Sequence, residues 1–163
     1  MTDAPLRKGA EELAAILSEK GLTLSLAESC TGGMIASAVI DIPGASSFFK
    51  GSAVTYSNES KEDLLNVPSG ILIAHGAVSA ETAEAMAAGA REIFGSDLAA
   101  SATGIAGPGG GTDQKPIGTV FVAVTDGIRT ECRRLLLKGS RDDIREGTAH
   151  NVIMMLRDLA GDG

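Results

Sequence analysis

The spacing of apolar residues predicts helices at both ends of the chain and in its middle. Residues 6–20 carry leucine and isoleucine at helical intervals, and Gly21 follows them as a C-terminal cap. The sequence also predicts a buried helix over 32–42, a helix over 79–94 that is capped by Ser79, and a last helix that is capped by Ser140 and Asp143. The apolar content of 44% is rich in alanine and poor in aromatic residues, which predicts a core of closely packed helices and strands.

Runs of alternating or continuous apolar residues between the helices predict strands. LTLSLAES at 22–29 alternates, and a second strand is predicted near 50–56. Three more candidates are DLAASATG, TVFVAVTD and TECRRLLL, the last two joined through Gly127 as a hairpin. Because helices lie before, between and after these strands, the pattern predicts an α/β fold with a mixed sheet.

Two further segments are defined by polar residues and glycine. Ser60 followed by Asp63 resembles a capping box and predicts a short helix, SKEDLLNV, that is closed by Pro68 and Gly70. Residues 104–118, GIAGPGGGTDQKPIG, are too rich in glycine for a regular element and long for a connection. Such a loop is typical of a functional segment.

Length, charge and the number of cysteines and histidines argue against several classes of protein, namely nucleic-acid-binding, membrane and zinc proteins. The 163 residues fit one domain, 1–163, and the formal charge of −7 without a basic run disfavours nucleic acid as a partner. The chain has no apolar run of membrane-spanning length and no signal-peptide pattern, so we expect a cytoplasmic protein. Its cysteines and histidines, Cys30, Cys132, His75 and His150, lack zinc-ligand spacing, so we expect neither a metal nor another cofactor.

The stretch AESCTGG places Ser29 where a predicted strand ends and a helix begins. This end of a strand is the usual ligand side of an open α/β sheet, and free N–H groups at the helix N-terminus can hold an oxyanion or a phosphate. The alternative is that Ser29 or Thr31 only caps the helix. The nucleophile elbow G-x-S-x-G is not matched, which disfavours an α/β-hydrolase.

The stretch TYSNESK places Lys61 in the first turn of another helix. The helix dipole disfavours a positive charge there, so Lys61 is a candidate for a lowered pKa and for taking a proton from a serine. A solvated surface lysine is the alternative, and Tyr56, the only tyrosine, can equally be a plain strand residue.

The glycine-rich stretch SATGIAGPGGG matches neither the dinucleotide fingerprint nor the P-loop. Its backbone N–H groups could bind an anion or a carbonyl oxygen. A flexible surface turn is the alternative.

Several ordered motifs together resemble the CinA C-terminal-domain family, whose members include nicotinamide-nucleotide amidohydrolases. They are AESCTGG, PGASSFFKG, VTYSNESK, GAVS at 76–79, TGIAGPGGG and GSRDDIR at 139–145, and the resemblance runs from about residue 6 to 158. It implies a single three-layer α/β/α domain. Larger CinA proteins carry an additional N-terminal domain of nucleotide-pyrophosphatase type, so this chain is expected to be the stand-alone form.

The resemblance implies hydrolysis of nicotinamide mononucleotide to nicotinate mononucleotide and ammonia. The family's serine, lysine, tyrosine and threonine correspond to Ser29, Lys61, Tyr56 and Thr103. We interpret Ser29 as the nucleophile, Lys61 as the general base, and Tyr56 and Thr103 as orienting or relaying groups. The expected substrate-binding residues are Cys30, Thr31, Gly32, Gly33, Gly104, Gly107, Gly109, Arg141 and Arg145.

The phosphate of this substrate needs basic or N–H partners. Arg141 or Arg145 is expected to bind it, aided by helix N-termini at 31–33 and 140–143.

Cys30 is an alternative nucleophile, since a thiolate at a helix N-terminus is reactive. A regulatory module linked to competence or DNA damage and an amidohydrolase for another small amide are alternative functions. A homo-oligomer is expected.

Overall fold

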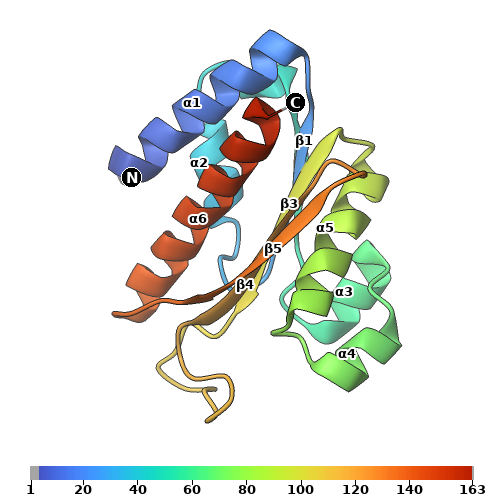
Figure 1. The fold of residues 1–163 in the computed structure, drawn as a ribbon, viewed down its shortest axis with the longest axis vertical. Coiled ribbons are helices and arrows are strands. Elements are labelled where there is room, and N and C mark those ends of the chain that lie inside the picture. Colours follow the sequence, from blue (N-terminus) through green and yellow to red (C-terminus); the bar gives the residue numbers. More distant parts are fainter. Residues whose placement is uncertain (1–3, 163) are drawn as a thin grey trace.

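The computed structural model describes residues 4–162, in which the five strands form one mixed sheet between two layers of helices (Figure 1). The strands are β1 (Leu24–Glu28), β2 (Phe49–Val54), β3 (Leu98–Gly104), β4 (Thr119–Thr125) and β5 (Thr130–Leu136). Their order is β2-β1-β3-β4-β5, with β1 parallel to β2 and β3, and with β4 antiparallel to β3 and β5. The predicted three-layer α/β fold and the β4–β5 hairpin are confirmed.

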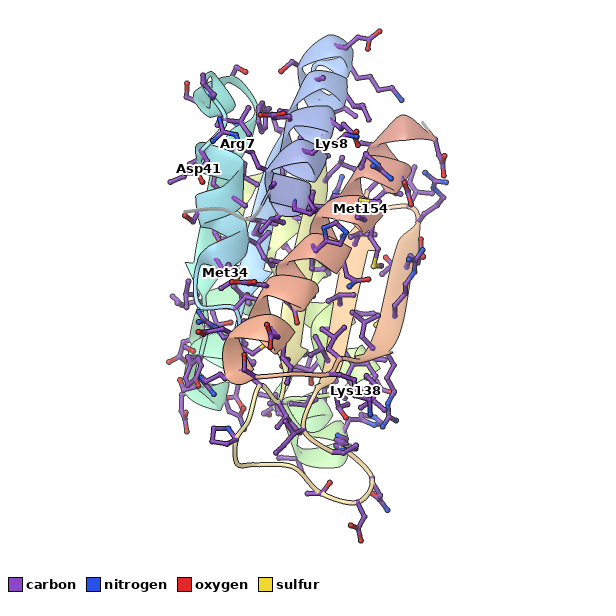
Figure 2. The ribbon with its side chains drawn as sticks, turned by 90° about the vertical axis from the view of Figure 1, so that its left-hand side faces the viewer. Arg7, Lys8, Met34, Asp41, Lys138 and Met154 are labelled. Carbon is purple, nitrogen blue, oxygen red and sulfur yellow. The ribbon has the colours of Figure 1, made fainter. Side chains whose placement is uncertain are left out.

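The helices divide between the two faces of the sheet. On one face lie α1 (Ala4–Lys20), α2 (Met34–Ile40) and α6 (Arg141–Gly161); on the other lie α3 (Asn58–Leu65), α4 (Ser69–His75) and α5 (Ala80–Phe94) (Figure 1). A short 3-10 turn, η1 (Ala45–Ser47), joins α2 to β2. Figure 2 shows the α1, α2 and α6 layer from outside, with Met34 at the beginning of α2 and Met154 on α6.

Each layer encloses its own apolar core. Leucine, isoleucine and valine fill the core under α1, α2 and α6, whereas alanine is prominent under α3, α4 and α5. Small side chains let α5 lie close to the sheet, which agrees with the high alanine and low aromatic content. None of the helices within residues 4–162 is long and apolar enough to cross a membrane.

Two details differ from the sequence predictions. The capping box at Ser60 and Asp63 is wrong, because α3 begins earlier and Ser57 is its N-cap, accepting a hydrogen bond from the backbone N–H of Ser60 at 3.1 Å. Helix α4 was not predicted, since its seven residues are too few to show a helical period. The irregular loop at 105–118 is as predicted.

The parallel strands bring three polar residues to one edge of the sheet. Glu28, the last residue of β1, lies level with the end of β2 and with Ala102 of β3. Ser29, Thr55 and Thr103 therefore lie one residue further on, at the carboxyl edge. Two hydrogen bonds extend the ladder to this row: Ser29 N donates to Ala102 O at 3.0 Å, and Thr55 N donates to Glu28 O at 2.8 Å. Open α/β sheets bind ligands at this edge.

Candidate active site

The turn after β1 presents Ser29 at the carboxyl edge, with 8% of its surface exposed. Residues 30–33 connect it to α2, and the N-cap residue is Gly33, with a φ of 100°. Glycine tolerates this left-handed conformation. The N-cap position belongs to Gly33 and no side chain makes a capping hydrogen bond there, so neither Ser29 nor Thr31 caps α2. The hydroxyl of Ser29 is therefore available for another partner.

The N-terminus of α2 instead receives a buried carboxylate. Glu28 is fully buried and accepts hydrogen bonds from the backbone N–H groups of Ile35 at 2.9 Å and Ala36 at 3.1 Å. Ser52 Oγ donates to the same carboxylate at 3.2 Å. A negative charge is favourable at a helix N-terminus. This differs from the expectation that residues 31–33 lead to free helix N–H groups for an anion, since Glu28 already occupies that position.

Lys61 reaches from α3 across the edge of the sheet to Ser29. Its Nζ donates to Ser29 Oγ at 3.0 Å and to the backbone oxygen of Thr55 at 2.6 Å, with a longer contact of 3.4 Å to the oxygen of Tyr56. Only 1% of Lys61 is exposed, and burial lowers its pKa from the ordinary 10.5, opposed by a smaller effect of Cys30. The predicted lowered pKa agrees with this geometry, and Lys61 is not a solvated surface lysine.

A cavity of about 170 Å³ opens beside this pair. Its lining residues are Ser29, Cys30, Tyr56, Lys61, Ala77, Val78, Thr103, Gly104, Ala106 and Arg141. It thus brings together the four catalytic candidates and three of the predicted binding residues. The other six predicted binding residues, Thr31, Gly32, Gly33, Gly107, Gly109 and Arg145, lie outside its lining. Residues 4–162 contain no group of three or more His, Cys, Asp or Glu side chains that could hold a metal ion.

The wall opposite Lys61 comes from β3 and from the segment between α4 and α5. Thr103 Oγ1 donates to the backbone oxygen of Ala77 at 2.8 Å, so its oxygen keeps lone pairs for a ligand. Gly104 is required by close packing, since a Cβ there would lie 2.6 Å from Cγ2 of Val120. The sequence offered one signal for this wall, the GAVS motif at 76–79, but gave its residues no role.

The mouth of the cavity is formed by two exposed side chains. Tyr56 is 65% exposed, and its hydroxyl accepts a hydrogen bond from Arg141 Nη2 at 3.4 Å. Arg141 Nη1 also donates to the backbone oxygen of Gly107 at 2.6 Å. A guanidinium has five N–H donors, so Arg141 retains donors for an anionic ligand.

The first turn of α6 carries the predicted capping box. Ser140 Oγ accepts from Asp143 N at 3.2 Å, and the Asp143 carboxylate accepts from Ser140 N at 2.8 Å, which confirms this prediction. The pKa of Asp143 is lowered by these hydrogen bonds. The capping carboxylate occupies this helix N-terminus as Glu28 occupies that of α2. A substrate anion near 140–143 would therefore depend on Arg141.

The alternative nucleophile, Cys30, is poorly suited to form a thiolate. It is 7% exposed, and burial raises the pKa of its thiol to about 11, opposed by smaller effects of its own backbone N–H and of nearby Arg145. A thiol must ionise to attack a carbonyl effectively. The side chain adjacent to Lys61 Nζ is the hydroxyl of Ser29, so the geometry favours Ser29 over Cys30.

The fold and this site define an α/β protein with a serine and lysine pair at the carboxyl edge of a mixed sheet. The family model of the CinA C-terminal domain matches residues 6–160, and the chain belongs to this family. A CinA-like protein from Citrifermentans bemidjiense is 52% identical over 147 residues, which are 90% of this chain and 36% of that protein. A putative competence-damage inducible protein from Desulforudis audaxviator is 49% identical over 142 residues, or 87% of this chain and 34% of that protein.

The chain thus spans about a third of the length of the curated relatives it matches. Solved structures of similar length share the whole fold. The competence/damage inducible protein CihA from Agrobacterium tumefaciens has a TM-score of 0.96 at 36% identity, covering 98% of both chains. A CinA superfamily protein from Klebsiella pneumoniae has a TM-score of 0.93 at 30% identity, covering 97% of this chain and 99% of that one.

Proposed function

We propose that this protein is a nicotinamide-nucleotide amidohydrolase, which hydrolyses nicotinamide mononucleotide to nicotinate mononucleotide and ammonia. One observation carries the hydrolytic part of the proposal: the buried Lys61 amine lies 3.0 Å from Ser29 Oγ at the wall of a cavity. A serine and lysine pair is a known variant of the catalytic triad on unrelated folds.

The neighbours of Lys61 suit both of its protonation states. A neutral amine has two N–H groups and one lone pair. If the N–H groups donate to the backbone oxygens of Thr55 and Tyr56, the lone pair is directed at the hydroxyl of Ser29. After Lys61 takes the proton, its ammonium has three donors for three oxygens. No carboxylate of the described residues lies within ion-pair distance of Lys61, so the neutral form is not disfavoured by an anion.

The reaction then proceeds through an acyl-enzyme. Lys61 takes the hydroxyl proton while Ser29 Oγ attacks the carboxamide carbon, and the C–N bond breaks as the nitrogen receives that proton and leaves as ammonia. A water molecule next attacks the ester carbon, giving a proton to Lys61. The bond between Oγ and the acyl carbon breaks, Ser29 regains a proton from Lys61, and the carboxylic acid product leaves and gives its proton to solvent to become the carboxylate. Splitting amide hydrolysis into two steps lowers each barrier.

Thr103 is suited to select the carboxamide. Its hydrogen is used in the bond to Ala77, so its oxygen faces a ligand as an acceptor. It can accept an N–H of the substrate amide, which an ester or a carboxylate lacks. Apolar side chains of Ala77, Val78 and Ala106 line the remaining wall and suit the flat pyridine ring.

The size of the cavity indicates how much of the substrate enters it. About 170 Å³ is less than the roughly 300 Å³ at which pockets for drug-sized ligands begin. Only the pyridine carboxamide is expected to enter, with the ribose phosphate at the mouth beside Tyr56 and Arg141. Binding energy from a remote phosphate can orient the reacting group and raise kcat.

Ammonia release from a panel of amides tests this function. We expect nicotinamide mononucleotide to be cleaved at least about a hundredfold more efficiently than free nicotinamide, roughly 2.7 kcal/mol of transition-state stabilisation. Ser29→Ala should abolish turnover and leave the thermal unfolding midpoint nearly unchanged, since this hydroxyl caps no helix.

The other outcomes separate the alternatives. Comparable kcat/KM values for the two substrates would reassign the protein to simple amides. Turnover of a different amide only would make it another amidohydrolase. Ammonia release from none of them, by a folded protein, would favour the regulatory module linked to competence or DNA damage.

A further inference from the structure

Three consecutive carbonyl oxygens in the turn between Ser29 and α2 accept hydrogen bonds. The oxygen of Ser29 accepts from Gly32 N at 3.1 Å. The oxygens of Cys30 and Thr31 each accept at 3.0 Å from the same side chain, through Nε and Nη2 of Arg145. One guanidinium therefore holds two consecutive peptide groups of the turn that carries the nucleophile.

Two N–H groups of the same turn, those of Cys30 and Thr31, differ from these oxygens and from the N–H of Gly32. Within residues 4–162, the backbone N–H groups of Cys30 and Thr31 have no acceptor oxygen, and that of Cys30 interacts only with the thiol of its own residue. The first turn of α2 is already bonded to Glu28. Peptide groups are planar and trans, so the N–H of Thr31 is directed away from the oxygen that Arg145 holds. Ser29 and Cys30 line the cavity, whereas Thr31 and Arg145 do not, which agrees with Arg145 holding the turn from the side away from the cavity.

We propose that Arg145 is a positioning residue, which holds the turn so that the N–H groups of Cys30 and Thr31 bind the oxyanion formed when Ser29 attacks. This inference rests on the proposed amidohydrolase function. The N–H group that follows a nucleophilic serine is a common oxyanion donor in other folds. Arg145 thus acts through the backbone and contacts no substrate.

The physical basis is polarisation together with fixed geometry. A positive charge at the oxygen end of a peptide group strengthens its N–H as a donor, because bonded groups in a low-dielectric site polarise one another. This effect acts on the N–H of Thr31, whose peptide group includes the oxygen of Cys30, whereas the N–H of Cys30 depends on the fixed geometry of the turn. Arginine is always charged and its planar fork can serve two oxygens at once, whereas lysine is a single point charge. The carboxylate of Asp142 lies 3.8 Å from Nη1 of Arg145. Because the Asp142 side chain is 80% exposed, solvent screens this ion pair, and the main partners of Arg145 are the two carbonyl oxygens of the turn.

This role excludes Arg145 as the main phosphate ligand and leaves that role to Arg141, which lines the cavity. The two arginines lie four residues apart on α6, so substitutions of each make a matched pair. Arg157→Gln provides a control on the same helix, because Arg157 bonds to Glu12 of α1, away from the cavity.

Steady-state kinetics with nicotinamide mononucleotide and with nicotinamide riboside, which lacks the phosphate, test the role. Arg145→Gln should lower kcat at least about tenfold for both substrates, with KM changed less than about threefold, because oxyanion donors act on the transition state. Arg145→Lys should recover part of the loss, and the pH profile set by Lys61 should not move. A loss confined to the phosphorylated substrate would show that Arg145 binds phosphate and would overturn the inference.

Labelling with a small alkyl fluorophosphonate provides a readout that does not depend on the substrate. The phosphonyl oxygen of the adduct occupies the oxyanion position. Wild-type protein and the Arg157→Gln variant should be labelled on Ser29 at equal rates. The Arg145→Gln variant should be labelled at least about tenfold more slowly than either. Equal labelling of Arg145→Gln would overturn the inference while leaving the amidohydrolase proposal intact. Failure to label Ser29 in the wild-type protein would overturn both.

Discussion

Two regions flank the Ser29 turn, and each brings a basic side chain to it in a different electrostatic setting. Helix α3 supplies Lys61, which is almost fully buried and donates hydrogen bonds to oxygens of Ser29, Thr55 and Tyr56. The start of α6 supplies Arg145, whose guanidinium is partly exposed and bonds two carbonyl oxygens behind the turn. Burial lowers the pKa of Lys61, so this group can exchange a proton. Arginine keeps its charge at any accessible pH and suits a fixed role.

The difference shows why the two cations are not interchangeable. A proton acceptor must exist partly in its neutral form, which requires burial without an anionic partner. A group that orients peptide dipoles must stay charged, which requires a guanidinium and tolerates some solvent. Substitutions at the two regions should therefore affect different kinetic parameters.

Removing the amine at position 61 should have the largest effect. Lys61→Met is expected to lower kcat by at least about a thousandfold, as general base catalysis and nucleophile activation are lost together. Lys61→Arg keeps a cation but cannot act as a base, so it should be equally inactive. Steady-state ammonia release measures both variants. Substantial activity in Lys61→Arg would contradict the role of Lys61 as a base.

The pH dependence of kcat/KM should report the pKa of Lys61. Only the neutral amine accepts the serine proton, so activity rises with pH, about tenfold per unit while Lys61 is mostly protonated. Because burial lowers this pKa, the curve should level off below the ordinary lysine value of 10.5. A rise that continues past that value, or one that persists in Lys61→Met, would assign the profile to another group.

Loss of the cation at the cavity mouth should affect the phosphorylated substrate alone. Arg141→Gln is expected to raise KM for nicotinamide mononucleotide about tenfold, since a charged hydrogen bond contributes about 1.5 to 3 kcal/mol. Turnover of free nicotinamide should change little. Parallel kinetics on the two substrates measure the difference. An equal loss for both would show that Arg141 supports the glycine loop through Gly107 rather than the phosphate.

Substitution of the neighbouring thiol should have the smallest effect. Cys30→Ala is expected to keep kcat/KM within a few-fold of the wild-type value, because a thiol whose pKa is raised to about 11 is almost wholly protonated at neutral pH. The backbone N–H of this residue is unaffected by the change. An inactive Cys30→Ala together with an active Ser29→Ala would show that the nucleophile is the thiol.

The fold was predictable where the local signals were strong. The α5 and α6 helices carry serine caps, and Gly127 marks the tight hairpin between β4 and β5. Prediction failed at the short α4 and at the true N-cap of α3, where Ser57 and Ser60 are both plausible caps. Tertiary packing decides between such alternatives, and a short stretch of sequence does not reveal that packing.

The sequence indicated most of the residues that line the cavity, but not which atoms several of them contact. Ser29 and Lys61 follow two strands that are adjacent and parallel, so the two side chains that the motif analysis paired lie within hydrogen-bond distance. The role of Glu28 was missed because it reaches the first turn of α2 from seven and eight residues upstream, beyond any local capping pattern. The partners of Arg145 are more than a hundred residues away along the chain, so no spacing indicated them.

The position of β2 has a consequence for how the protein loses activity. This strand forms one edge of the sheet and is bonded only to β1, while β1, β3 and β4 each have neighbours on both sides. Edge elements open locally at a lower free energy than central ones. Lys61 lies on the helix that follows β2, so fraying of this edge separates base from nucleophile while the central strands stay paired. We therefore expect the catalytic pair to be among the first parts of the native structure to open.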